Sequence, residues 1–101
     1  MYSEFSWKPE DLFRQKFLLG RVLVTPSVLK LAPADLISVW LNRHQSGDWG
    51  VVSANDWEAN NYDLQRGNQL LSAYKTPEGI KIWIITEADR LKTIILLPSE
   101  Y

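Results

Sequence analysis

Two strongly apolar, β-branched runs, residues 80–86 and 93–98, constrain most what this chain can fold into. Successive side chains of an extended strand point to opposite faces of a sheet. One face of the two runs is then almost wholly aliphatic, with Ile80, Ile82, Ile84, Thr86, Thr93, Ile95 and Leu97. The pattern predicts an antiparallel hairpin at the centre of a sheet, with helices covering its aliphatic face.

The opposite face of this hairpin is mixed in character, with Lys81, Trp83, Ile85, Lys92, Ile94 and Leu96. Large apolar patches on soluble proteins usually bind something, so this face is a candidate partner surface. Alternatively, the N-terminal segment covers it.

The rest of the chain divides into shorter elements. Helices are predicted at residues 9–17, 26–30, 33–47 and 54–67, and strands at residues 18–24 and 70–74. A Pro-Glu-Gly sequence at residues 77–79 predicts a turn before the hairpin. Runs of helices and then strands, rather than alternation, indicate the α+β class. We therefore expect an antiparallel sheet with a C-terminal three-stranded meander, packed against helices on one face.

One polar residue interrupts an otherwise apolar helix face. In the helix predicted at residues 54–67, Asn61 shares a face with Ala54, Trp57 and Leu64. A buried amide needs hydrogen-bond partners. Asn61 is therefore predicted to hold this helix to a neighbouring backbone segment.

Length and composition restrict the class of protein. With 101 residues, 46% of them hydrophobic, the chain is large enough for one core, and we expect a single domain with an N-terminal arm at 1–19 and a core at 20–101. The absence of cysteine excludes disulfides and thiolate metal sites. A net charge of −1 argues against a broad nucleic-acid-binding surface. No run approaches the roughly 20 apolar residues of a membrane span, and residues 1–16 lack a signal-peptide core, so a cytoplasmic protein is expected.

His44 is a candidate functional residue with two interpretations. It lies in the last turn of the helix predicted at residues 33–47, where the helix dipole favours the protonated imidazole. In the local interpretation, it caps its own helix and donates a hydrogen bond to Asp48. In the catalytic interpretation, His44, Tyr74 and Arg90 converge near Ser72 and Thr86 and provide the base, acid and phosphate clamp of metal-independent RNA cleavage.

The loop of residues 86–90 is the most polar stretch beside the most apolar strands. Its side chains could project from a rigid hairpin and bind a partner together with exposed aromatic residues. The candidate binding residues are Trp49, Trp83, Thr86, Glu87, Asp89 and Arg90. In the structural interpretation, Arg90 pairs with Asp89 or Glu87 and the loop only closes the turn. No cluster with metal-ligand spacing and no phosphate-binding loop is present, so neither a metal nor a cofactor is expected.

Several short strings resemble one family of bacterial proteins. They are His-Gln-Ser-Gly-Asp-Trp-Gly at residues 44–50, Leu-Ser-Ala-Tyr at 71–74, Trp-Ile-Ile-Thr-Glu-Ala-Asp-Arg at 83–90 and Leu-Pro-Ser-Glu-Tyr at 97–101, together with Asn60. Over residues 20–101 the chain is similar to small proteins common on plasmids and phages, often described as plasmid-related. Some members carry the label of a type I restriction methylation subunit, but the glycine-rich loop of such a cofactor domain is absent here. The resemblance implies a setting in mobile DNA rather than a reaction.

These observations lead to three hypotheses. The first is a protein-binding or regulatory module that a mobile element uses to counter a host defence component. The second is a metal-independent ribonuclease or toxin-like enzyme acting on RNA through His44, Tyr74 and Arg90. The third is a structural or dimerisation unit, in which the edge of the meander or the mixed sheet face pairs with a second copy of the chain.

Overall fold

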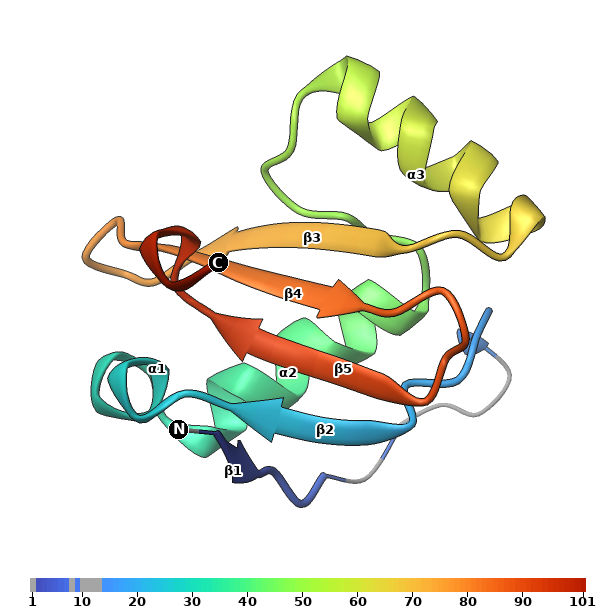
Figure 1. Ribbon diagram of the computed structural model, residues 1–101. Helices are drawn as coiled ribbons and strands as arrows, with labels where there is room; N and C mark the ends of the chain where they lie inside the picture. Colours follow the sequence, from blue (N-terminus) through green and yellow to red (C-terminus); the bar gives the residue numbers. More distant parts are fainter. Residues whose placement is uncertain (1, 8, 10–13) are drawn as a thin grey trace.

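The computed structural model describes residues 2–7, 9 and 14–101 (Figure 1). Within this part of the chain, five strands form one sheet in the order β1-β2-β5-β4-β3. The strands are Ser3–Glu4 (β1), Arg21–Val24 (β2), Leu70–Lys75 (β3), Lys81–Thr86 (β4) and Lys92–Leu96 (β5). The helices are Pro26–Leu31 (α1), Ala34–Gln45 (α2) and Ala54–Arg66 (α3), and a 3-10 turn spans Pro98–Glu100. The predicted α+β class is confirmed.

The C-terminal meander forms as the alternation predicts. β3 pairs antiparallel with β4, and β4 pairs antiparallel with β5. Ile84 lies opposite Ile95, and Thr86 lies opposite Thr93. This register gathers the aliphatic side chains of both runs on one face, because residues opposite each other share a face.

The sheet is mixed rather than antiparallel throughout, so that part of the fold prediction was wrong. β2 pairs with β5 in parallel, with Arg21 opposite Lys92 and Val24 opposite Ile95. A parallel pair needs a long crossover, and here the whole chain from α1 to β4 lies between the two strands. Gly20 permits the close approach at the start of β2: its φ is +65°, and a Cβ there would lie 2.2 Å from the carbonyl carbon of Leu91.

Residues 3–5 of the expected N-terminal arm join the sheet. Ser3 and Glu4 form an antiparallel edge strand against Val24 and Leu23. The backbone N–H of Phe5 then donates to the carbonyl oxygen of Val22 at 2.7 Å. The strand predicted at residues 18–24 begins only at Arg21. Residues 10–13 of the helix predicted at residues 9–17 lie outside the described part of the chain, and residues 15–17 are not helical, so the prediction was wrong there.

Local capping explains where two of the helices begin. The hydroxyl of Thr25 accepts a hydrogen bond from the backbone N–H of Val28 at the start of α1. The hydroxyl of Ser53 accepts one from Asp56 at the start of α3, and Gly67 ends α3 in the left-handed conformation. Each N-cap hydrogen bond of this kind stabilises a helix by about 1 kcal/mol. Both helices therefore start as the sequence predicts.

The two faces of the sheet differ. α2 lies behind the sheet in Figure 1 and buries Ile37, Trp40 and Leu41 in the core. The ring of Trp40 stacks on that of Tyr74 from β3, with a centroid distance of 6.0 Å. No α-helix lies across the face turned toward the viewer in Figure 1, and α3 lies beyond the β3 edge. The prediction of helices on one face agrees with this arrangement.

The outer edge of β3 is covered by the segment that precedes and includes α3. The backbone N–H of Val51 donates to the carbonyl oxygen of Ala73 at 2.7 Å, and Ala73 donates to Trp49 at 3.1 Å. Gly50 between them has a φ of +79°, and a Cβ there would lie 1.9 Å from the carbonyl oxygen of Ala73. An exposed strand edge can pair with other chains, so this cover limits aggregation through β3.

Candidate functional site

His44 is fully buried against the sheet, so the prediction that the helix dipole favours a protonated imidazole was wrong. The rings of Phe17 and Trp49 cover the last turn of α2, with centroids 5.1 Å and 5.6 Å from the imidazole. Burial, followed by the positive charge of Arg90, lowers the pKa of His44 to about 3. The predicted donation to Asp48 is also absent, because Asp48 instead accepts two hydrogen bonds from the guanidinium of Arg43, at 2.8 Å and 3.3 Å.

The imidazole belongs to a buried chain of hydrogen bonds. Its Nδ1 contacts the hydroxyl of Ser72, and its Nε2 lies 2.9 Å from the hydroxyl of Thr86. The Thr86 hydroxyl lies 2.7 Å from that of Thr93, which donates to the carbonyl oxygen of Leu19 at 2.7 Å. Every polar atom of the histidine ring is thereby satisfied inside the core.

This series of hydrogen bonds determines which nitrogen of His44 carries the proton. Thr93 uses its one hydroxyl proton on Leu19, so Thr86 must donate to Thr93. Thr86 then has no proton left for the imidazole, and Nε2–H must donate to Thr86. Nδ1 is the acceptor and takes the proton of Ser72. His44 is therefore the neutral Nε2–H tautomer, held in a structural role.

Tyr74 and Arg90 lie near His44, but each has other partners. The hydroxyl of Tyr74 donates to the carbonyl oxygen of Asp48 at 2.6 Å, and burial raises its pKa. One Arg90 nitrogen donates to the carbonyl oxygens of Asn68 at 2.7 Å and Glu87 at 3.0 Å. The ring of Phe17 contacts both His44 and the Arg90 guanidinium. The side chains of His44 and Tyr74 are inaccessible to a phosphodiester in this structure, because both are buried.

The side chains of the loop at residues 86–90 mainly bond to the loop itself and to adjacent residues of the chain. Glu87 forms an ion pair with Lys92 at 3.2 Å, and Asp89 accepts a hydrogen bond from the backbone N–H of Leu91. Arg90 has a positive φ of 61° and bonds to carbonyl oxygens rather than to the carboxylates expected in the structural interpretation. Glu87 and Asp89 keep surface exposure, whereas Thr86 is buried beneath the loop.

Trp49 also lies in the core rather than at a binding surface. Its side chain is fully buried, and its indole N–H donates to the side-chain oxygen of Asn61 at 2.9 Å. Asn61 therefore does not bond to a backbone segment as predicted. The preceding residue does so: the Asn60 amide donates to the carbonyl oxygen of Leu71 at 2.7 Å and accepts from its N–H at 3.1 Å. A shift of one residue turns a helical side chain by about 100°, which is enough to exchange the two roles.

Trp83 is the predicted binding residue that lies on the face without α-helices, which we call the uncovered face. The apolar side chains of the uncovered face come from four neighbouring strands: Leu23, Leu71, Ala73, Trp83, Ile85, Ile94 and Leu96. The rings of Trp83 and Tyr101 meet edge to face, with a centroid distance of 5.8 Å. Trp83 is half-buried and Tyr101 is exposed, so this aromatic pair stands on the surface.

Two hollows flank the aromatic pair. One, of about 340 Å³, lies between α3 and the strands and includes Asp56, Asp63, Leu71 and Trp83 in its lining. The other, of about 300 Å³, has a floor of Ile85, Ile94 and Leu96, with Tyr2, Glu87, Glu100 and Tyr101 around it. Gln69 borders both. Both hollows are shallow, and their linings combine apolar side chains with polar and acidic ones.

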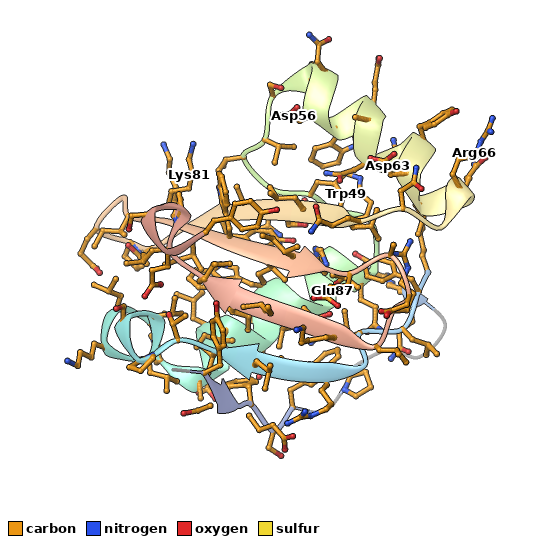
Figure 2. All side chains as sticks on the ribbon, in the orientation of Figure 1. Trp49, Asp56, Asp63, Arg66, Lys81 and Glu87 are labelled. Atoms are coloured by element: carbon orange, nitrogen blue, oxygen red, sulfur yellow. The ribbon has the colours of Figure 1, made fainter. Side chains whose placement is uncertain are left out.

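The charged residues that line the two hollows are acidic, although the strands of the same face also carry Arg21, Lys75, Lys81 and Lys92. The lining of the two hollows includes Asp56, Asp63, Glu87 and Glu100, but no lysine or arginine. Figure 2 shows Asp56 and Asp63 along α3 and Glu87 near the end of β4. Hydrogen bonds from the backbone N–H of Leu97 and from Thr25 hold the pKa of Glu100 below its usual range, so this carboxylate is ionised at neutral pH.

Neither a metal centre nor a membrane span is evident in the described residues. No group of three or more histidine, cysteine, aspartate or glutamate side chains is arranged there to hold a metal ion. No helix in the same residues is long and apolar enough to cross a membrane.

Comparisons with known proteins give no further guidance. No protein-family model matches the chain, and neither the curated proteins nor the solved structures contain a match.

Proposed function

We propose that this chain is a protein-binding module whose contact surface is the uncovered face of its sheet. The observation that supports the proposal is the half-exposed pair of Trp83 and Tyr101 above an apolar floor and between two hollows. Tryptophan and tyrosine residues of this kind frequently supply most of the binding energy of protein interfaces.

The setting is part of the same proposal. The similarity of the strings at residues 44–50 and 83–90 to proteins of plasmids and phages suggests a small cytoplasmic protein of a mobile element. Such a protein would act by occupying a host defence or regulatory component. The buried state of His44 and Tyr74 gives the ribonuclease alternative no comparable support.

A site-specific crosslinker tests the proposal. A photoreactive phenylalanine analogue at Tyr101, which is 72% exposed, should form an adduct of defined mass in cells of the native host. The matched control places the same analogue at Val39, which is 46% exposed on α2, behind the sheet. The captured protein, once purified, should bind the wild-type chain and lose about tenfold or more in affinity with Trp83→Ala. Equal capture at both positions, or an affinity unaffected by Trp83→Ala, would contradict the proposal.

A further inference from the structure

We infer that the segment bound by the uncovered face is basic: a peptide that places lysine or arginine side chains in the two hollows beside Trp83 and Tyr101. This inference rests on the proposed function and specifies the chemistry of the partner. It follows from the linings of the hollows, which combine an apolar floor with carboxylates and contain no cationic side chain.

Lysine and arginine suit such hollows because their side chains have two parts. The aliphatic stem packs on apolar surface while the charged head reaches toward polar groups at the rim. In the hollow beside α3, the floor includes Leu71 and Trp83, and Asp56 and Asp63 stand in the first and third turns of the helix. In the second hollow, Ile94 and Leu96 form part of the floor and Glu100 lies at the rim.

The aromatic side chains strengthen the preference for a cation. Trp83 lines the first hollow, and Tyr2 and Tyr101 line the second. A guanidinium or ammonium group is attracted to the face of an aromatic ring, most strongly to tryptophan. An anionic segment would meet four carboxylates at the same places, which is unfavourable.

The carboxylates differ in how firmly they are held. Glu100 accepts hydrogen bonds from Leu97 and Thr25, and Glu87 is paired with Lys92. Asp63 accepts one from the side chain of Asn68. The Asp56 carboxylate has no hydrogen-bond or ion-pair partner elsewhere in the described part of the chain. Asp56 is therefore the residue most available to a bound cation.

The basic side chains of this face line neither hollow, although Lys92 forms an ion pair with Glu87 at 3.2 Å. Lys75 and Lys81 are directly opposite each other at the far end of the β3–β4 pair, and both are exposed. Like charges in directly opposed positions disfavour the sheet slightly. Figure 2 shows Lys81 at the opposite end of β4 from Glu87, and Lys75 lies beside it in β3.

Titration with short peptides tests the inference. Eight-residue peptides in which valine alternates with lysine, glutamate or serine are added to the full ¹⁵N-labelled chain, and the indole N–H resonance of Trp83 is followed. The lysine peptide should shift this resonance with the lowest Kd, and raising the salt concentration should weaken binding. Asp56→Asn should weaken it about two- to fivefold.

Two control variants sharpen the result. Glu58→Gln removes the same charge from an exposed position on α3 that lines neither hollow, and it should leave the Kd unchanged. Lys81→Gln should leave the affinity for the lysine peptide unchanged or increase it. Equal binding of all three peptides, or equal effects of Asp56→Asn and Glu58→Gln, would overturn the basic partner but leave the binding surface intact.

The remaining outcomes separate this inference from the proposed function. If no peptide shifts the Trp83 resonance while the crosslinker at position 101 captures a protein, the basic partner is wrong and the proposed function stands. If both experiments fail, both are wrong. A shift that depends on protein concentration without peptide would show that a second copy of the chain occupies the face, and this would also overturn the inference.

Discussion

The imidazole of His44 donates through Nε2–H to the hydroxyl of Thr86, 2.9 Å away, although the two residues lie on different elements of the core. This contact holds the last turn of α2 to the end of β4. It also fixes the tautomer, because Thr86 donates its hydroxyl proton to Thr93, and Thr93 donates its own to the carbonyl oxygen of Leu19. The histidine that sequence reasoning offered as a catalytic base is in this structure a neutral structural group.

Stability should fall on mild acidification because of this residue. The folded-state pKa of His44 is lowered to about 3, below the ordinary value of 6.5. Between these values the unfolded chain binds a proton that the folded chain does not. The free energy of unfolding therefore has its full contribution from neutral His44 above pH 6.5 and decreases as the pH falls. The slope reaches at most about 1.4 kcal/mol per pH unit. Urea unfolding between pH 7.5 and 5 measures it, and His44→Gln should flatten the curve because the chain has one histidine.

Thr93→Val should remove one member of the buried chain without changing the shape of the side chain. The carbonyl oxygen of Leu19 then loses its donor and the hydroxyl of Thr86 loses its acceptor. We expect a loss of about 1–3 kcal/mol in the free energy of unfolding. The double variant with Thr86→Val should lose less than the sum of the two single variants, because their partners are shared. Strict additivity would show that the two hydroxyls are not coupled.

Asn60→Ala and Asn61→Ala form a matched pair on adjacent residues of α3. Asn60→Ala should cost about 1–3 kcal/mol, because it leaves both backbone groups of Leu71 without partners at the β3 edge. Asn61→Ala removes a single bond, from the indole N–H of Trp49, and should cost less. Thermal unfolding of both variants decides the order. A larger loss for Asn61→Ala would contradict the observed contacts.

Gly50→Ala and Gly67→Ala distinguish the cost of a positive φ from the cost of a steric clash of the added Cβ. Both glycines have a positive φ, but only Gly50 faces the chain closely, with a Cβ position 1.9 Å from the carbonyl oxygen of Ala73. Gly67→Ala should cost about 1 kcal/mol from strain alone. Gly50→Ala should cost about 3 kcal/mol or more, because the segment must also separate from β3. Equal melting temperatures for the two variants would contradict this account.

Most secondary structure could be predicted from local patterns, but the pairing of distant segments could not. The alternation at residues 80–86 and 93–98 predicts the central hairpin, and the caps Thr25 and Ser53 predict two helix starts. The parallel pairing of β2 with β5 has no local signal, because its partners are separated by all three helices and two strands of the described chain. The mixed sheet therefore becomes evident only in three dimensions.

Only part of the candidate site could be predicted, because it too depends on contacts between distant segments. The alternation placed Trp83 on the mixed face correctly. It did not reveal that His44 would be buried, because the covering rings of Phe17 and Trp49 come from outside the helix that carries it. The sequence analysis also did not predict that α3 contributes the acidic side chains of one hollow. Asp56 and Asp63 are seven residues apart, a spacing that places two side chains on one helix face and could have served as the signal.

The most direct test of the central claim is an NMR titration of the chain with the protein captured through position 101, comparing the indole N–H resonances of Trp83 and Trp49. The account predicts that Trp83 and its neighbours on the uncovered face shift, while the buried Trp49 and the residues around His44 do not. Shifts centred on His44, Ser72 and Trp49, with Trp83 unchanged, would contradict it.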